Sequence, residues 1–315
     1  MKKQYREKIQ NIQDELHKVI VGQDTLIRDM LIGLFARGHV LLEWVPWLWK
    51  TLAVSTLAKI VDGKFQRIQF TPDLLPSDLI WARVFNQNTS DFSIKKWPIF
   101  ANFVLADEIN RSPAKVQSAL LEAMAEKQVT IANETYQLEK PFMVLATQNP
   151  IEQDGTYNLP EAQLDRFLLK TIVDYPSEED EIKIMKWNIA LQETVEKQIT
   201  KKDILDTQKH IEEEIFVDDT IFSYAKDIVF YTRSKDSKIH TLLQFWASPR
   251  ASIALIRCAK VLAFLEGRDF VIPEDIKVVA YPVLRHRLIL SYEALADSIN
   301  VENIIDSIFQ NVTLK

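Results

Sequence analysis

The chain has 315 residues, of which 47% are hydrophobic and 26% charged, a composition typical of a folded globular protein. Its length allows a larger and a smaller domain, each with its own core. The formal net charge of −6 and the pI near 5.5 argue against a broad nucleic-acid surface, which needs clustered lysine and arginine. The polar N-terminal segment differs from a signal peptide, and no apolar run reaches the roughly 20 residues of a membrane span. We therefore expect a cytoplasmic protein.

The cysteine and histidine contents argue against further classes of protein, and the glycine content is unusually low. Cys258 is the single cysteine and lies in an apolar helical run, so cysteine supplies neither a disulfide nor a metal site. The five histidines are scattered, which argues against a metal enzyme. The chain has only six glycines. Ordinary usage of roughly 7% would give about twenty.

Helical periodicity runs through residues 1–35, where Ile9, Ile12 and Leu16 share one face, and it predicts an N-terminal helix. A short apolar strand over 39–43 and a helix over 51–60 follow. This strand, loop and helix order is that of a phosphate-binding unit.

Two more apolar runs, 103–106 and 142–146, alternate with helical segments such as 113–126. Strands that are apolar on both faces indicate a parallel α/β sheet. Residues 129–138 alternate around a turn and predict a β-hairpin.

The strand signal fades after Pro176, and four helices are predicted over 177–197, 218–233, 249–266 and 273–288. Pro249 and Pro273 stand where a helix can begin. We predict an α/β domain over residues 1–175 and a smaller all-helical domain over 176–315.

Asp107 and Glu108 end the second apolar run, and they are the strongest local chemical signal. The carboxyl end of a parallel strand faces the ligand crevice, where Asp107 would hold Mg²⁺ and Glu108 would activate a water. Alternatively, both acids cap a helix that begins at Ile109. The pattern alone leaves both interpretations open.

The third apolar run ends in Thr147, Gln148, Asn149 and Pro150. An amide at this edge could orient the attacking water, and a turn-forming Asn-Pro is the alternative.

Lys50 and Thr51 follow the first strand and open a helix, where an ammonium can reach phosphates and a hydroxyl can bind Mg²⁺. The phosphate-loop pattern Gly-x-x-x-x-Gly-Lys-Thr has glycine at its first and sixth positions. In this chain both positions, 44 and 49, are tryptophan. The loop preceding Lys50 consists of Trp44, Val45, Pro46, Trp47, Leu48 and Trp49. Its amides must approach the phosphates closely, with dihedrals that bulky residues resist.

Six motifs together resemble the MoxR-type AAA+ ATPases, over nearly the whole chain. They are Val21-Gly22-Gln23, residues 38–43, residues 70–78, residues 105–111, residues 146–150 and residues 159–167. Residues 247–252 and 282–287 resemble the lid domain of the same family. The resemblance implies an α/β AAA+ P-loop fold with a parallel-sheet core followed by a smaller all-helical lid.

The resemblance also implies the role of each site residue. Lys50 and Thr51 would complete Walker A, with Val21 and Gly22 beside the bound nucleotide, and Thr51 and Asp107 would hold Mg²⁺. Glu108 would be the catalytic acid of Walker B and Asn149 would be sensor 1. Arg166 would be the arginine finger that completes a neighbour's site, and Arg250 would be sensor 2. A salt bridge of Arg166 to Asp165 and a surface charge at Arg250 are the alternatives.

As implied by the resemblance, ATP and Mg²⁺ would be held between the α/β domain and the lid, and the assembly would be a homo-oligomer, a hexameric ring. The family's ATPases act as motors or chaperones on protein clients, commonly with a partner that bears a von Willebrand factor A domain. Nucleic acid is not an expected partner.

Six tryptophans stand where the family pattern has glycine, at positions 44, 47, 49, 81, 97 and 246. A decaying enzyme would drift to many residue types and would also lose residues such as Lys50, Glu108 and Arg166. Some bacterial lineages read UGA as glycine, and translating that codon as tryptophan gives this pattern. We therefore expect glycine at 44, 47 and 49 in the natural protein.

Two other functions stay open at this stage. If the tryptophans are real, the chain would be a catalytically inactive AAA+ scaffold. The 128–138 hairpin could instead belong to a DNA-directed motor, although it carries Glu134 and neither lysine nor arginine at Val129–Leu138.

Overall fold

A computed structural model of the chain describes residues 2–44, 49–86, 91–96, 98–131, 134–148, 155–189 and 195–314. Its first half is built on a five-stranded sheet in the order β2-β5-β8-β1-β9, and every neighbouring pair is parallel. The strands are β1 (Val40–Trp44), β2 (Phe65–Gln69), β5 (Phe103–Asp107), β8 (Met143–Gln148) and β9 (Leu169–Val173). The predicted α/β fold with a parallel-sheet core is confirmed.

Successive residues of a strand face opposite sides of the sheet, and the core follows that period. In β5, Phe103 and Leu105 join one buried cluster, whereas Val104 and Ala106 join another. The first cluster is covered by α1 (Lys2–Val19), α2 (Asp24–Phe35) and α3 (Trp49–Val61). The second lies under α4 (Pro76–Ile80) and α5 (Ala114–Glu126).

The helical domain packs against the same side of the sheet as the first cluster. Its elements are α8 (Lys201–Glu214), α9 (Asp219–Arg233), α10 (Pro249–Leu265), α11 (Pro273–Leu284), α12 (Tyr292–Ala296), α13 (Val301–Asn311) and the short strands β10 (Leu243–Phe245) and β11 (Ile289–Leu290). Buried residues from α2, β1, α8 and α10 all belong to one cluster. The expectation of a separate core for each domain is therefore wrong, because the helical domain shares its core with one face of the sheet.

The predicted single helix over 1–35 is two helices. Gly22 separates them with φ +71°, a conformation that glycine adopts readily. A Cβ on Gly22 would also lie 2.5 Å from Oδ2 of Asp180. Periodicity continued through the break because both helices bury the same kind of apolar face.

Two predicted helices end early. The helix predicted over 177–197 is α7 (Glu178–Ile189), and residues 195–200 are not helical. Helix α8 then begins after Thr200, whose side chain caps the amide of Asp203. The sequence did not indicate α8, because Thr207 and Gln208 interrupt its buried face. Helix α11 ends at Leu284, and the next three residues form a turn.

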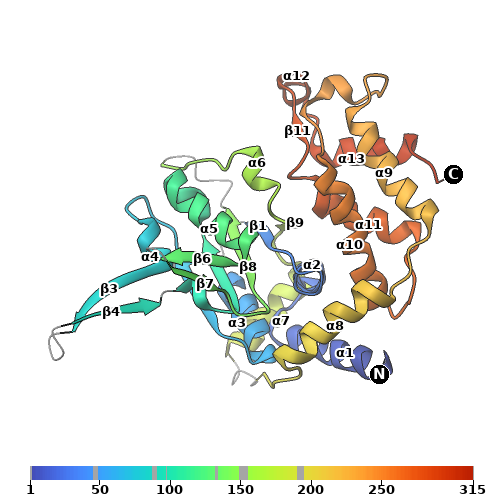
Figure 1. Cartoon of the computed structure of the whole chain (residues 1–315). Helices are drawn as coiled ribbons and strands as arrows, with labels where there is room; N and C mark the ends of the chain where they lie inside the picture. Colours follow the sequence, from blue (N-terminus) through green and yellow to red (C-terminus); the bar gives the residue numbers. More distant parts are fainter. Residues whose placement is uncertain are drawn as a thin grey trace.

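Three further features complete the picture. The predicted hairpin is present as β6 (Gln128–Ile131) and β7 (Glu134–Gln137). A second hairpin, β3 (Trp81–Asn86) with β4 (Asp91–Lys96), was not predicted and extends away from the body of the protein (Figure 1). No helix among the described residues is both long and apolar enough for a bilayer span.

Candidate functional site

Asp107 is the last residue of β5 and lies at the carboxyl edge of the sheet. Its side chain is largely buried, and its two oxygens have different partners. Oδ2 accepts from Nη2 of Arg67 at 2.6 Å, and Oδ1 accepts from the hydroxyl of Thr147 at 2.7 Å. These contacts fix the orientation of a buried carboxylate.

Glu108 follows in the left-handed region, with φ 57° and ψ 50°. Such dihedrals are costly for a residue with a Cβ and concentrate at functional sites. Its carboxylate accepts from Gln69 at 2.8 Å and pairs with Arg111 at 3.2 Å. Only a short 3₁₀ turn, Ile109–Arg111, follows, and Glu108 makes no side-chain capping hydrogen bond. The helix-capping alternative for this residue is wrong.

Thr147 joins the two acids. Its hydroxyl donates to Asp107, and it accepts from the backbone N–H of Glu108 at 2.9 Å. Thr147 is fully buried near the end of β8, the strand beside β5. The sequence shows this residue as part of a motif. Its hydrogen bonds to both acidic residues depend on β8 lying beside β5, which the sequence does not show.

The predicted Walker A segment begins at the same edge. Trp44 ends β1, Trp49 and Lys50 open α3, and Thr51 is partly exposed in the first turn of that helix. β1 neighbours β8, so this segment starts two strands from the acid pair, at a spacing of roughly 10 Å. Val45, Pro46, Trp47 and Leu48 lie outside the described residues, as does Asn149.

The Val21-Gly22 turn also reaches this edge. Gln23 donates from its side-chain amide to the carbonyl of Asp174, which directly follows β9. The last residue of β9, Val173, pairs with Trp44 of β1. The turn between α1 and α2 is therefore close to the start of the Walker A segment.

Arg166 lies at the opposite edge. It precedes β9, and the N–H of the nearby Leu168 donates to the carbonyl of His39, just before β1. Strands of this length separate the two edges by about 15 Å. Nη1 of Arg166 donates to the carbonyl of Leu121 in α5 at 2.9 Å. Among the described residues, Asp165 pairs with other arginines, so the predicted alternative of an Arg166–Asp165 salt bridge is wrong.

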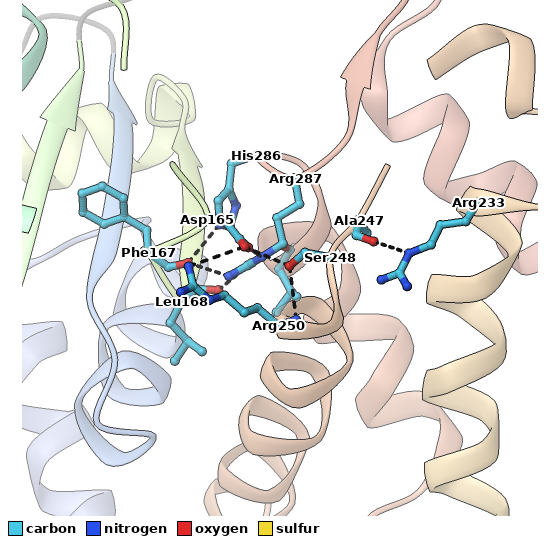
Figure 2. A network of polar contacts seen from close by, with 10 residues as sticks. Asp165, Phe167, Leu168, Arg233, Ala247, Ser248, Arg250, His286 and Arg287 are labelled. Atoms are coloured by element: carbon cyan, nitrogen blue, oxygen red, sulfur yellow. Dashed lines mark hydrogen bonds and ion pairs between the residues drawn. The ribbon is translucent and has the colours of Figure 1, made fainter. Parts of the chain in front are cut away.

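Asp165 instead fastens the loop before β9 to the helical domain (Figure 2). It accepts from Nε of Arg287 at 2.7 Å and from the hydroxyl of Ser248 at 2.8 Å, and it lies 3.7 Å from Nη1 of Arg250. Arg287 is almost completely buried, and it also donates to the carbonyl of Phe167. Burial lowers the pKa of Arg287, whereas Asp165 opposes that shift.

Arg166 and Arg250 line one cavity of about 490 Å³. The side chain of Arg250 is 62% exposed there. The structure therefore brings Arg250 to Arg166 and to the amino edge of the sheet, away from the carboxyl edge that carries Asp107. A surface charge at Arg250 remains compatible with this exposure.

Trp246 is the one described side chain among the six unexpected tryptophans. It is 43% exposed and stacks on His240, with ring centroids 5.1 Å apart. The surface of the helical domain accommodates this indole.

Comparison with known proteins agrees with this arrangement. Residues 39–169 match the ATPase family associated with various cellular activities, and residues 235–308 match the AAA lid domain. The chain is 48% identical over 304 residues to Chaperone MoxR1 of Mycobacterium tuberculosis, covering 95% of this chain and 80% of that protein. It is 29% identical over 332 residues to Protein MoxR of Methylorubrum extorquens, covering 98% and 95% of the two chains.

The crystal structure of a candidate ATPase from Cytophaga hutchinsonii has a TM-score of 0.92 and 48% identity, and it covers 99% of this chain and 96% of that one. The match extends over both the sheet domain and the helical domain. By sequence, by fold and by the placement of its acid pair, the chain belongs to the MoxR-type AAA+ ATPases.

Proposed function

We propose that this protein is an Mg²⁺-dependent ATPase that works as a ring-forming motor or chaperone on partner proteins. The observation that carries the proposal is the pair Asp107 and Glu108, fixed by Thr147 at the sheet edge where α3 begins. A carboxylate and a threonine hydroxyl are hard oxygen donors of the kind that Mg²⁺ prefers. The residues present at this edge therefore suit Mg²⁺ and a nucleotide.

In this proposal Lys50 binds the terminal phosphates, while Thr51 and Asp107 hold the metal. Bound Mg²⁺ would neutralise charge on the phosphates. Glu108 polarises the attacking water, and Asn149 orients it. Val21 and Gly22 border the nucleotide, since their turn lies near the start of Walker A.

Arg166 and Arg250 would act on a neighbouring protomer. Both line a cavity at the amino edge of the sheet, and this position supports a role at a neighbour's site rather than at their own Walker A segment. A head-to-tail assembly puts the amino edge of one protomer against the carboxyl edge of the next, and such contacts close into rings. This arrangement supports a hexamer whose lid contributes to the adjacent site, and it replaces the expectation of a lid closing over its own nucleotide.

The proposal includes glycine at 44, 47 and 49 in the natural protein. The acid pair, its threonine and the two arginines keep an arrangement suited to hydrolysis, which a decayed enzyme would have no reason to preserve. With tryptophan in the loop, indoles of roughly 200 Å² each would compete with phosphate, and an inactive scaffold would be the alternative function.

One relative is named a chaperone, and that name supports the proposal of protein clients for this chain. A cytoplasmic setting is part of the same proposal. We propose an accessory partner with a von Willebrand factor A domain, as the family resemblance implies. A pull-down with a Glu108→Gln variant, which would hold ATP without hydrolysing it, tests for clients and for that partner.

The ATPase rate per protomer, measured against protein concentration, tests the proposal as a whole. A site completed by a neighbour loses specific activity on dilution, and Arg166→Ala should abolish turnover while ATP still binds. Activity that is independent of dilution would contradict a shared site. Absence of ATP binding by protein made in its source organism would contradict the nucleotide site itself.

A further inference from the structure

The cavity that holds Arg166 and Arg250 is strongly cationic, although the whole chain has a net charge of −6. It is lined by six basic and two acidic residues: Arg37, Lys127, Arg166, Arg250, Arg257 and Arg287, with Glu126 and Asp165. The lining charge is thus about +4, from these six and two. Such an excess favours an anionic ligand.

Some of these cations are neutralised within the protomer. Arg287 and Arg250 share Asp165, and Arg37 pairs with Glu212 at 3.0 Å. Arg166 and Arg257 donate only to backbone carbonyls among the described residues. The ammonium of Lys127 likewise has neither a hydrogen-bond acceptor nor a carboxylate partner among the described residues.

Lys127 is held in a costly position. It follows α5 with φ 54° and ψ 29°, the left-handed conformation in which helices usually place glycine. Burial lowers the pKa of its ammonium, and the nearby charges of Arg257, Lys140 and Arg37 lower that pKa further. Within one protomer, no contact among the described residues stabilises the charged ammonium of Lys127.

Lys127 and Arg166 are both anchored to α5. Lys127 caps the helix by donating its N–H to the carbonyl of Ala123, and Arg166 bonds to the carbonyl of Leu121. Leu121 and Lys127 are six positions apart, about 9 Å along a helix. Two long cationic side chains at that spacing can reach one extended polyanion.

We infer that Lys127 is a second cation that acts across the ring interface, contacting the phosphates of the nucleoside triphosphate held by the neighbouring protomer. This inference rests on the proposed function. It adds a residue to the shared site and explains why the cavity is more basic than Arg166 and Arg250 require. A bound phosphate would offset the free energy lost when the Lys127 ammonium is buried beside other cations.

Lys127→Gly is the decisive variant, because glycine suits the backbone at this position. We expect an unchanged or higher melting temperature together with an ATPase rate lowered about tenfold or more. Lys127→Arg should retain most of the activity. The matched control is Lys209→Ala, which removes an exposed lysine on α8 outside the cavity and should leave the rate unchanged. All variants are made in the full chain with glycine at the six unexpected tryptophans.

Mixing distinguishes an action on the neighbour from an action within the protomer. Glu108→Gln protomers cannot hydrolyse ATP but keep Lys127, so they can complete the site of a Lys127→Gly neighbour. With random mixing in equal amounts, about half of the Lys127→Gly sites face an intact lysine, and turnover should rise well above that of either variant alone. Arg166→Ala mixed with Glu108→Gln is the reference for a shared site.

Recovery with Arg166→Ala but not with Lys127→Gly would overturn the inference and leave the proposed function standing. Recovery with neither would overturn both. A Lys127→Gly protein with unaltered turnover would also overturn the inference.

Discussion

Nε of Arg287 donates a 2.7 Å hydrogen bond to Oδ1 of Asp165, and this contact joins the helical domain to the loop that carries Arg166. The Arg287 side chain is only 3% exposed. The guanidinium also donates to the carbonyls of Phe167 and Leu168, at 2.7 and 3.1 Å. The buried guanidinium of Arg287 thus binds the loop before β9 through a side chain of that loop, Asp165, and through two of its backbone carbonyls.

Asp165→Ala should destabilise the fold by about 3–5 kcal/mol, because it leaves a buried guanidinium without its carboxylate. Urea unfolding measures this. Asp62→Ala removes a carboxylate from an exposed pair with Lys197 and should change the unfolding midpoint little. A similar midpoint for both variants would contradict the role given to Asp165.

Thr147→Val should lower the ATPase rate about tenfold or more, since a small displacement of catalytic groups has a large kinetic effect. The variant loses the hydroxyl that orients Asp107 and receives the N–H of Glu108. Thr147→Ser keeps the hydroxyl and should retain activity. Steady-state kinetics compare the two, and equal rates would show that the hydroxyl is dispensable.

We expect the free energy of unfolding to fall in mild acid because His39 is buried. Burial lowers its pKa to about 4. Its Nδ1 accepts from the N–H of Val144, so a proton on Nδ1 would face a donor. The folded-state pKa lies below the unfolded value of 6.5, so the folded state binds fewer protons in this window. Stability is complete above the unfolded pKa and is lost as pH falls towards 4, by up to about 3 kcal/mol.

Replacing His39 by glutamine checks this pH dependence. Glutamine offers a donor and an acceptor but does not titrate, so unfolding free energies at about pH 7 and about pH 5 should differ less than in the unaltered protein. Part of the slope should remain, because burial also lowers the pKa of His286. An identical slope in both proteins would assign the effect to other groups.

Changing Trp44, Trp47 and Trp49 together to glycine should raise the affinity for Mg-ATP by about tenfold or more, because bare amides can then approach the phosphates. Calorimetric titration measures the affinity. Trp246→Gly is the control, since that indole lies exposed on the helical domain against His240. Tight binding by the chain with tryptophan would refute the argument, as would tryptophan at these positions in native peptides analysed by mass spectrometry.

The central strands could be predicted because their residues are apolar on both faces. β5 and β8 were found within two residues of their true bounds. β2 (Phe65–Gln69) was missed since it is an edge strand with exposed Gln66 and Arg67. β9 was missed at the other edge, because only Leu169, Thr171 and Val173 are buried, and Lys170 and Ile172 on the opposite face are not.

The residues of the candidate site could be predicted as sequence motifs, but the sequence did not predict which of them lie together in the fold. Spacing in the sequence does not reveal that Asp165 and Arg287, 122 positions apart, form a buried pair. It also could not place Arg250 beside Arg166, because that requires knowing where the helical domain packs on the sheet. Lys127 gave no signal, since its left-handed backbone and its basic neighbours exist only in the folded chain.

The apolar cluster shared by the sheet domain and the helical domain limits how this protein can move. A rotation about a free linker would pull α10 from α2 and expose side chains such as Leu255 and Leu31 to water. Packed helices can instead slide past one another by small amounts without parting. Under the proposed function, nucleotide-driven motion would be a shear along this shared cluster, and both halves should melt in one cooperative transition.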